Sequence, residues 1–251
     1  MAQYGIGQPV SRDEDPQLLR GDGRYVADVD KAGQCYGVVV RSTHAAARIR
    51  SVDIGAALAV PGARLVLTGA DLADSGLGTV LPEAPRQRRD GSPATFSPQP
   101  LLMTDQVRYV GDCIAFVVAD TLDHARDGAE LVEVEYEALE AVITSEAAVA
   151  TGARLIWDAC PGNEAFFHEA GDREAVDAAV AAAPHVIRHK FVINRITTNA
   201  MEPRASVADY DRRTGRYTIW CTVQIPHPTR VTLAEQIFKI PETRIRVVCE
   251  Q

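Results

Sequence analysis

A carboxamide, an imidazole and a guanidinium stand close together in the stretch Gln224-Ile-Pro-His227-Pro-Thr-Arg230. The residues before it, 217–223, alternate apolar and more polar side chains, which is the period of a strand with one buried face. Gln224 is therefore expected at a strand end, where its amide can offer two N–H donors and one acceptor to a bound polar centre. The alternative is that Gln224 only caps the turn, since polar residues at element ends commonly satisfy backbone groups.

A turn and then a helix are predicted after Gln224. Pro226 and Pro228 cannot continue a strand ladder, but Pro228 fits the first turn of a helix. The apolar residues that follow recur at helical spacing: Val231, Ala234, Ile237 and Phe238. The predicted order of strand, turn and helix is one in which folds of mixed strands and helices place ligand-binding groups.

The thiol of Cys160 and the imidazole of His168 form a second candidate pair, as in a hydrolase with a cysteine nucleophile. No orienting third residue or oxyanion motif accompanies them, which disfavours that chemistry. The chain has five scattered cysteines and no Cys-x-x-Cys pair. A zinc site, an iron–sulfur cluster or a disulfide framework is therefore not expected.

Composition narrows the possible partners. The net charge is -8 and the only dense basic cluster is Arg86-Gln-Arg88-Arg89, which we interpret as a solvated loop. Nucleic-acid binding requires a concentrated basic face, so no nucleic-acid partner is expected. No run of eighteen apolar residues occurs and residues 1–16 are polar, so we expect neither a membrane span nor a secretory signal, and a cytoplasmic location follows.

Hydrophobic periodicity predicts a mixed architecture of strands and short helices. Strands are predicted over Cys35–Arg41, Ile49–Val52, Arg64–Gly69, Cys113–Ala119 and Val132–Glu137. Helices are predicted after the capping residues Asp53, Thr121 and Asp172, the last ending at Ala183. The glycines of the stretch 21–29 predict a turn followed by a short strand. In the strand 132–137 the three glutamates are expected to face water.

The C-terminal part of the chain adds a long strand, a hairpin and a last strand. The long strand is predicted over His185–Ile196, with Val186, His189 or Phe191, and Ile193 facing inward. The segments 205–210 and 216–223 flank a turn and predict the hairpin, and 245–249 predicts the last strand. Residues 75–100 form a loop rich in glycine and proline that is functional, disordered or packed against something absent from the chain.

Seven blocks of sequence, in order, carry a family resemblance. Gly21–Val29, Arg41–Ile49, Val107–Gly111 and Glu130–Glu137 resemble the a/b hammerhead domain of the aldehyde oxidase and xanthine dehydrogenase family. Met201–Arg204, Gln224–Arg230 and Ile240–Val248 resemble the start of the molybdenum-cofactor-binding domain, as found in large subunits of the aerobic carbon monoxide dehydrogenase type. The resemblance covers nearly the whole chain.

The resemblance implies an α+β fold with an a/b hammerhead domain followed by the beginning of a molybdopterin-binding α+β domain. The implied division is an N-terminal extension over 1–18, the hammerhead domain over 19–150, a connection over 151–171 and a truncated cofactor-domain start over 172–251. The family's base glutamate and glycine-rich cofactor segment have no counterpart here. The chain is thus expected to be the N-terminal part of a hydroxylase large subunit, as a truncated gene product, a fragment or a split subunit.

The resemblance also implies the roles of individual residues. Gln224 matches the glutamine that hydrogen-bonds an oxygen ligand of the molybdenum in a molybdopterin cytosine dinucleotide cofactor, while no catalytic residue and no metal ligand is expected in this chain. We interpret Glu202 and Arg204 as a structural ion pair, and His227 as a turn or packing residue.

The expected partners follow from the family as well. They are an iron–sulfur subunit and an FAD subunit, or the missing C-terminal portion, and a homo-oligomer is possible. The alternative is a non-catalytic fragment or interaction module with the hammerhead fold, associating through open sheet edges.

Overall fold

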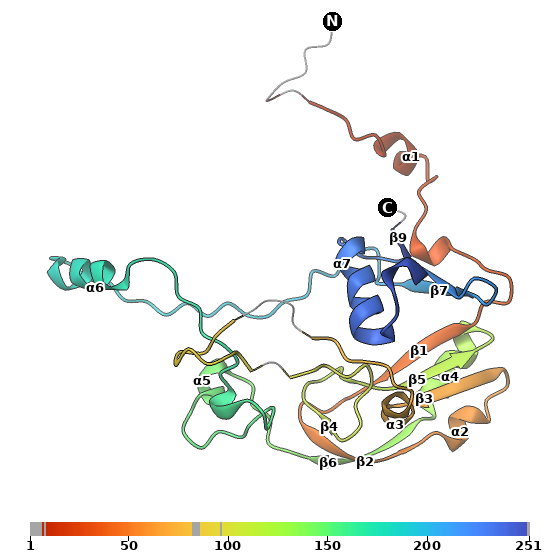
Figure 1. Cartoon of the computed structure of the whole chain (residues 1–251), viewed down its shortest axis with the longest axis horizontal. Coiled ribbons are helices and arrows are strands. Elements are labelled where there is room, and N and C mark those ends of the chain that lie inside the picture. Colours follow the sequence, from red (N-terminus) through yellow and green to blue (C-terminus); the bar gives the residue numbers. More distant parts are fainter. Residues whose placement is uncertain (1–6, 8, 82–85, 96, 250–251) are drawn as a thin grey trace, which may run out of the picture. The chain divides into compact units, whose positions relative to one another are not determined.

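The computed structural model describes residues 7, 9–81, 86–95 and 97–249, and its contacts divide the chain into two units. One unit contains the described residues of 1–34 and 200–251, and the other contains residues 35–199. Both mix helices and strands, as expected of an α+β fold (Figure 1). No helix among the described residues is both long and apolar enough to cross a membrane.

The unit of residues 35–199 is built on two antiparallel sheets. The first has the order β1-β5-β3, with β1 over Tyr36–Arg41, β5 over Cys113–Ala119 and β3 over Ala63–Thr68. β5 lies between the other two, and Ile114, Ala115, Val117 and Ala119 are fully buried along it. A continuous apolar run is what a central strand with both faces covered requires.

The second sheet has the order β4-β2-β6, with β4 over Gln106–Val107, β2 over Ala47–Asp53 and β6 over Glu133–Ala138. Val134 and Tyr136 of β6 are half-buried, while Glu133 and Glu135 are exposed. Glu135 accepts a hydrogen bond from the Ser51 hydroxyl at 3.2 Å. The predicted solvated face of this strand is confirmed for these two glutamates.

Three short helices accompany the two sheets of this unit. α4 (Leu122–Glu130) packs on β1 and β5 and begins where the Thr121 hydroxyl accepts a hydrogen bond from His124 N at 3.2 Å. α2 (Gly55–Leu58) lies against α4, with the Asp53 carboxylate accepting from Gly55 N. α3 (Gly69–Asp74) follows β3. The predicted cap at Thr121 is therefore confirmed, whereas the N-cap residue of α2 is Ile54 rather than Asp53 and no side chain caps that helix.

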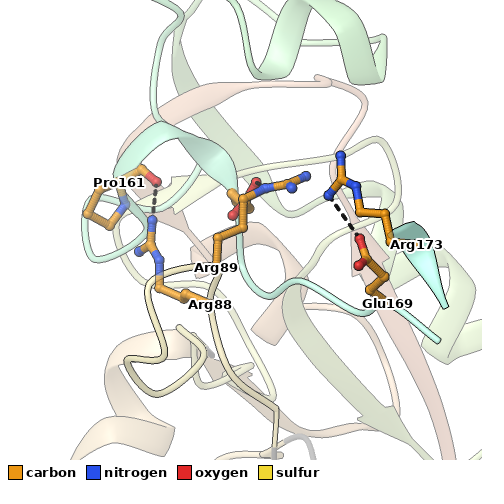
Figure 2. A network of polar contacts seen from close by, with 6 residues as sticks. Arg88, Arg89, Pro161, Glu169 and Arg173 are labelled. Carbon is orange, nitrogen blue, oxygen red and sulfur yellow. Dashed lines mark hydrogen bonds and ion pairs between the residues drawn. The ribbon is translucent and has the colours of Figure 1, made fainter. Parts of the chain in front are cut away.

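The described part of the long loop is packed against a segment of this chain. Arg88 donates to the carbonyl oxygen of Pro161 at 3.1 Å, and Thr95 N donates to Ala165 O at 2.9 Å. Arg89 pairs with Glu164 at 3.4 Å, within the polar network of Figure 2. Residues 86–95 are thus packed against a segment of this chain, which the sequence analysis did not predict; residues 82–85 and 96 lie outside the described structure.

The remaining helices of this unit are α5 (Ser145–Ala148), the 3₁₀ turn η2 (Pro161–Asn163) and α6 (Arg173–Ala182). α6 begins where the Asp172 carboxylate accepts a hydrogen bond from Ala175 N at 2.9 Å, which confirms the predicted helix. No residue of α6 is buried.

Two sequence predictions of strands are wrong. His185–Ile196 is extended but belongs to no sheet, because none of its backbone groups is hydrogen-bonded to a described residue. In the stretch 21–29 the structure has the 3₁₀ turn η1 (Val26–Asp28). Its capping box closes the turn locally, because Tyr25 N donates to the Asp28 carboxylate and Asp28 N donates to Tyr25 O, both at 2.9 Å.

The other unit is built on a sheet of order β7-β8-β9, with β7 over Ser206–Asp211, β8 over Arg216–Cys221 and β9 over Ile245–Val248. β7 and β8 form the predicted antiparallel hairpin, and β9 runs parallel to β8. The hairpin turn is held by Asp211, whose carboxylate accepts from Arg213 N at 2.8 Å, and by Gly215 at a φ of 68°.

Two side chains of β8 are packed against other elements of the unit, although most of β7 stays exposed. On one side the π-helix η3 (Thr232–Phe238), which continues α7 (Pro226–Val231), places Phe238 on Tyr217 of β8 with ring centroids 4.9 Å apart. Trp220 is covered by Lys31 Nζ at 4.1 Å from its ring centroid. The sequence predicted the helix after Pro228, but neither its contact with Tyr217 nor the contact of Lys31 with Trp220. The N-terminal segment also contains α1 (Asp15–Leu19). The 3₁₀ turn η4 (Glu242–Arg244) leads into β9.

Candidate functional site

Gln224 lies in the bend between β8 and α7, exposed to solvent. β8 ends at Cys221 and α7 begins at Pro226, so Pro228 lies in the first helical turn, as predicted. The N-cap residue of α7 is Ile225, and no side chain caps the helix. The Gln224 carboxamide forms no hydrogen bond with any described residue, so the capping alternative finds no support in these contacts.

The backbone on either side of Gln224 is held by its neighbours. Cys249 Sγ donates to the carbonyl oxygen of Val223 at 3.3 Å, and Thr222 N donates to Ala205 O at 3.1 Å. Because β8 and β9 are parallel, their carboxyl ends meet at the same edge of the sheet. Gln224 therefore follows the carboxyl end of a parallel strand pair, which is where α/β sheets bind ligands.

The expected ion pair between Glu202 and Arg204 is wrong. The Glu202 carboxylate instead accepts a hydrogen bond from the Thr222 hydroxyl at 3.3 Å. Neither Glu202 nor Arg204 takes part in an ion pair within the described residues. The physical reason is the β7–β8 pairing, which places the Thr222 hydroxyl nearer to this carboxylate than the guanidinium two residues away.

Sequence reasoning missed Thr222 and Cys249 as neighbours of the candidate site. Both belong to alternating strand patterns, which predict the face of a residue but not its partner on another strand. The missing information was that the strand 245–249 pairs in parallel with β8. A crossover helix between the two strands is the usual sign of parallel pairing, and the predicted helix after Pro228 was that sign.

A cleft of about 520 Å³ lies beside α7 and β9. Arg230 pairs there with Glu242 at 2.8 Å, whereas Arg216 and Arg246 form no ion pair with a described residue. The cleft is therefore positively charged and suits an anionic group. His227 lines it and is exposed in the first turn of α7. Gln224 does not line the cleft, so the role inferred for Gln224 does not depend on the cleft.

The thiol of Cys221, close to the candidate site, is buried and unreactive. Cys221 is buried at the end of β8, and burial raises the pKa of its thiol, with the nearby Cys249 adding to the effect. A raised pKa keeps the thiol protonated and unreactive. The alternative nucleophile Cys160 is also buried, and no hydrogen bond links it to the exposed His168 among the described residues.

The described residues contain no group of three histidine, cysteine or acidic side chains that could hold a metal ion. The chemistry available near Gln224 is that of a neutral hydrogen-bond donor on an anchored backbone. Such a donor orients a polar ligand held by other groups. The residues present therefore fit a cofactor that carries its own metal ligands.

Comparison with known proteins identifies the class. Residues 20–140 match the family model described as aldehyde oxidase and xanthine dehydrogenase, a/b hammerhead domain, and residues 156–251 match the molybdopterin cofactor-binding domain. The chain belongs to the aldehyde oxidase and xanthine dehydrogenase family.

Three relatives illustrate the match. The chain is 37% identical to the 6-hydroxypseudooxynicotine dehydrogenase complex subunit gamma of Paenarthrobacter nicotinovorans, over 98% of this chain and 30% of that protein. It is 36% identical to the carbon monoxide dehydrogenase large chain of Afipia carboxidovorans, over 97% and 30%. The crystal structure of quinoline 2-oxidoreductase from Pseudomonas putida 86 superimposes with a TM-score of 0.82 at 34% identity, covering 100% of this chain and 31% of that chain.

The chain thus spans 30% of the length of these two curated relatives. The predicted α+β fold, the hammerhead unit and the molybdopterin-binding character of the C-terminal part are confirmed by these matches. The relatives named as a complex subunit and a large chain are components of larger assemblies.

Proposed function

We propose that this chain is the N-terminal part of the large subunit of a molybdenum-dependent hydroxylase. The reaction is the oxidative hydroxylation of an aldehyde, an N-heterocycle or carbon monoxide, with water as the oxygen source. The observation that carries the proposal is the exposed Gln224 carboxamide, which has no hydrogen-bond partner among the described residues, at the carboxyl end of the parallel pair β8 and β9. These 251 residues alone do not turn over substrate, because the family's base glutamate has no counterpart among them.

Gln224 would help to hold the cofactor of such an enzyme by donating an N–H to a polar atom of the bound group. A molybdenum–molybdopterin cofactor, in its cytosine dinucleotide form, supplies the two-electron oxidation chemistry. A neutral amide orients such an atom without cancelling its charge, as fixed dipoles do in other active sites. The anchoring of Val223 by Cys249 and of Thr222 by Ala205 limits the movement of the backbone that carries the amide.

The assembly that we propose contains an iron–sulfur subunit and an FAD subunit, which remove the electrons, and it resides in the cytoplasm. Within the chain we retain the division into residues 1–18, 19–150, 151–171 and 172–251 as a prediction. The competing proposal is a folded module without catalysis. It is separated from the first by the experiment below.

The test uses a fusion in which this chain replaces the matching N-terminal part of the carbon monoxide dehydrogenase large chain of Afipia carboxidovorans. The fusion is produced with that enzyme's other subunits, and its metal content is measured by mass spectrometry. We expect about one molybdenum per fusion chain. A fusion with a folded circular dichroism spectrum and no molybdenum would favour the non-catalytic module.

A further inference from the structure

Residues 172–199 form an arm in which every residue is exposed. It consists of α6 and of the extended segment that follows, and Figure 1 shows α6 standing away from the sheets of its own unit. Within the described residues, a single ion pair joins the extended segment to the rest of the unit, between Lys190 and Glu146 of α5. A segment this exposed gains almost nothing from burial within the described chain.

The side chains of the extended segment alternate as in a strand. Ile187, Phe191 and Ile193 lie on one side and are 94%, 81% and 92% exposed. The rings of His189 and Phe191 lie 4.6 Å apart edge to face, as residues two apart on one side of a strand do. Isolated apolar residues on a surface are ordinary, but a contiguous row of large ones marks an interaction site.

The backbone of this segment is unpaired as well. No N–H or C=O group of residues 185–196 is hydrogen-bonded to any part of the chain that the structure describes. An extended backbone with open donors and acceptors, flanked by exposed apolar side chains, has the features of a strand that adds to the sheet of another polypeptide. Val192 and Ile196 on the opposite side are 75% and 88% exposed, so both faces require cover.

Charge argues against a second copy of this chain as the occupant. Residues 185–201 contain no acidic side chain, and Arg188 and Arg195 form no ion pair with a described residue. Two such segments paired side by side would place like charges next to each other, which is destabilising.

Length argues for the rest of a large subunit. The molybdopterin-binding match begins at residue 156 and includes the whole arm, while the curated relatives are more than three times as long as the part matched here. The crystal structure of quinoline 2-oxidoreductase aligns with 100% of this chain, so the arm has a counterpart within a much longer polypeptide.

We propose that residues 185–196 form a strand inserted into a β-sheet of the polypeptide that completes the molybdopterin-binding domain. This inference rests on the proposed function, since it requires that such a polypeptide exists. The arm is then the element through which the two parts of the cofactor-binding domain are joined.

Amide hydrogen exchange tests the insertion on two samples, the 251-residue chain alone and the fusion with the Afipia carboxidovorans large chain. In the chain alone the amides of residues 186–196 exchange as fast as those of an unfolded peptide. In the fusion they are slowed at least about 100-fold, because a sheet amide exchanges only after local opening. Unslowed exchange in a fusion with a folded circular dichroism spectrum would overturn the proposal.

Two variants separate strand insertion from loose apolar contact. Ile193→Pro removes one N–H that has no partner in the chain alone, so it leaves the stability of that chain unchanged but abolishes the slow exchange in the fusion. Ile193→Ala, which keeps the N–H, retains most of the slow exchange. Equal effects of the two variants would contradict pairing through the backbone.

A matched pair of surface variants tests the side chains. Phe191→Lys places a charge in the inserted row and lowers the yield of soluble fusion at least about tenfold. Ile143→Lys alters a residue of similar exposure, 83% against 81%, outside the arm and leaves the yield unchanged. Slow exchange in the chain alone that grows with its concentration would instead identify a second copy as the occupant.

Molybdenum content separates this inference from the proposed function. A fusion that protects the arm but holds no molybdenum supports the inserted strand and contradicts the hydroxylase assignment. A fusion that holds molybdenum with a freely exchanging arm supports the hydroxylase and contradicts the inserted strand.

Discussion

Cys249 Sγ donates a hydrogen bond to the carbonyl oxygen of Val223 across 3.3 Å, which ties the end of β9 to the residue before Gln224. A thiol is a weak donor, and the bond contributes less than an N–H to oxygen bond. The location of this bond matters more than its strength, because it links the end of β9 to the segment between β8 and α7. The backbone at Gln224 is thereby fixed while its side chain is left free for a ligand.

Replacing Gln224 by alanine should separate stability from activity. The side chain is exposed and unbonded within the described structure, so Gln224→Ala should change the free energy of unfolding by less than about 0.5 kcal/mol. In the fusion enzyme the same change should lower turnover about 100-fold, because a preorganised donor is lost. Urea unfolding and steady-state kinetics provide the two measurements.

The isosteric variant Gln224→Glu is the control for shape. It keeps the size of the side chain but presents only acceptors when ionised, so it should be at least as slow as the alanine variant. Turnover of Gln224→Glu near the wild-type rate would contradict a donor role for this residue.

Asp112 is a fully buried acidic residue in the unit of residues 35–199. Its side chain is 1% exposed, one carboxylate oxygen accepts from Arg108 N at 2.7 Å, and the other has no partner among the described residues. Asp112→Ala removes the acceptor of the half-buried Arg108 N–H and should lower the free energy of unfolding by about 1 to 3 kcal/mol. Urea denaturation measures the loss.

Asp127 of α4 provides the comparison for Asp112. It is exposed, and Asp127→Ala should stay within about 0.5 kcal/mol of the wild-type chain. Asp112→Asn retains an acceptor for Arg108 N and should lose less stability than Asp112→Ala. If the two substitutions at position 112 were equally harmful, the hydrogen bond to Arg108 would not be the cause.

The sequence predicted the hammerhead strands and caps well because their signals are local. The apolar run 113–119 is buried on both faces in β5, and the capping residues Thr121 and Asp172 each accept the expected backbone hydrogen bond. It failed for His185–Ile196 because alternation describes a residue pattern, whereas a strand also needs a neighbour. No described part of these 251 residues supplies that neighbour.

The sequence predicted where the candidate site lies along the chain, but not which residues form hydrogen bonds around it. The end of a strand at Gln224 followed from the period of residues 217–223 and from two prolines. The hydrogen bond from Thr222 to Glu202 joins residues on adjoining segments of the chain, and that from Cys249 to Val223 depends on parallel pairing. Neither partner can be read from spacing, since both depend on strand register.

Gly69 begins α3 against the backbone of the following loop. A Cβ added there would lie 2.3 Å from the carbonyl oxygen of Met103, which is backbone and cannot rotate away. Gly69→Ala should therefore destabilise the chain by about 1 to 3 kcal/mol through overpacking. Thermal unfolding measures the effect. Gly37→Ala meets only the Phe116 ring, a side chain that can move, and should cost less.

Acidification should weaken the start of α3. The Asp71 carboxylate accepts hydrogen bonds from Thr68 N and from the Thr68 hydroxyl, both at 2.7 Å, and these bonds lower the pKa of Asp71, the hydroxyl most strongly. A carboxyl group with a lowered pKa in the folded state stabilises the fold above its unfolded pKa, and this contribution is lost as the pH falls through the folded value. Asp71→Asn should therefore reduce the urea midpoint at pH 7, while its difference from the wild-type chain shrinks as the pH is lowered below about 4.

The control for Asp71 lies on the same helix. The Asp74 carboxylate forms no hydrogen bond with a described residue, and Asp74→Asn should leave the difference between the pH 7 and pH 3 midpoints as it is in the wild-type chain. A constant difference between Asp71→Asn and the wild-type chain across this range would show that the Asp71 charge does not stabilise the fold, and that only the shape of the capping side chain matters.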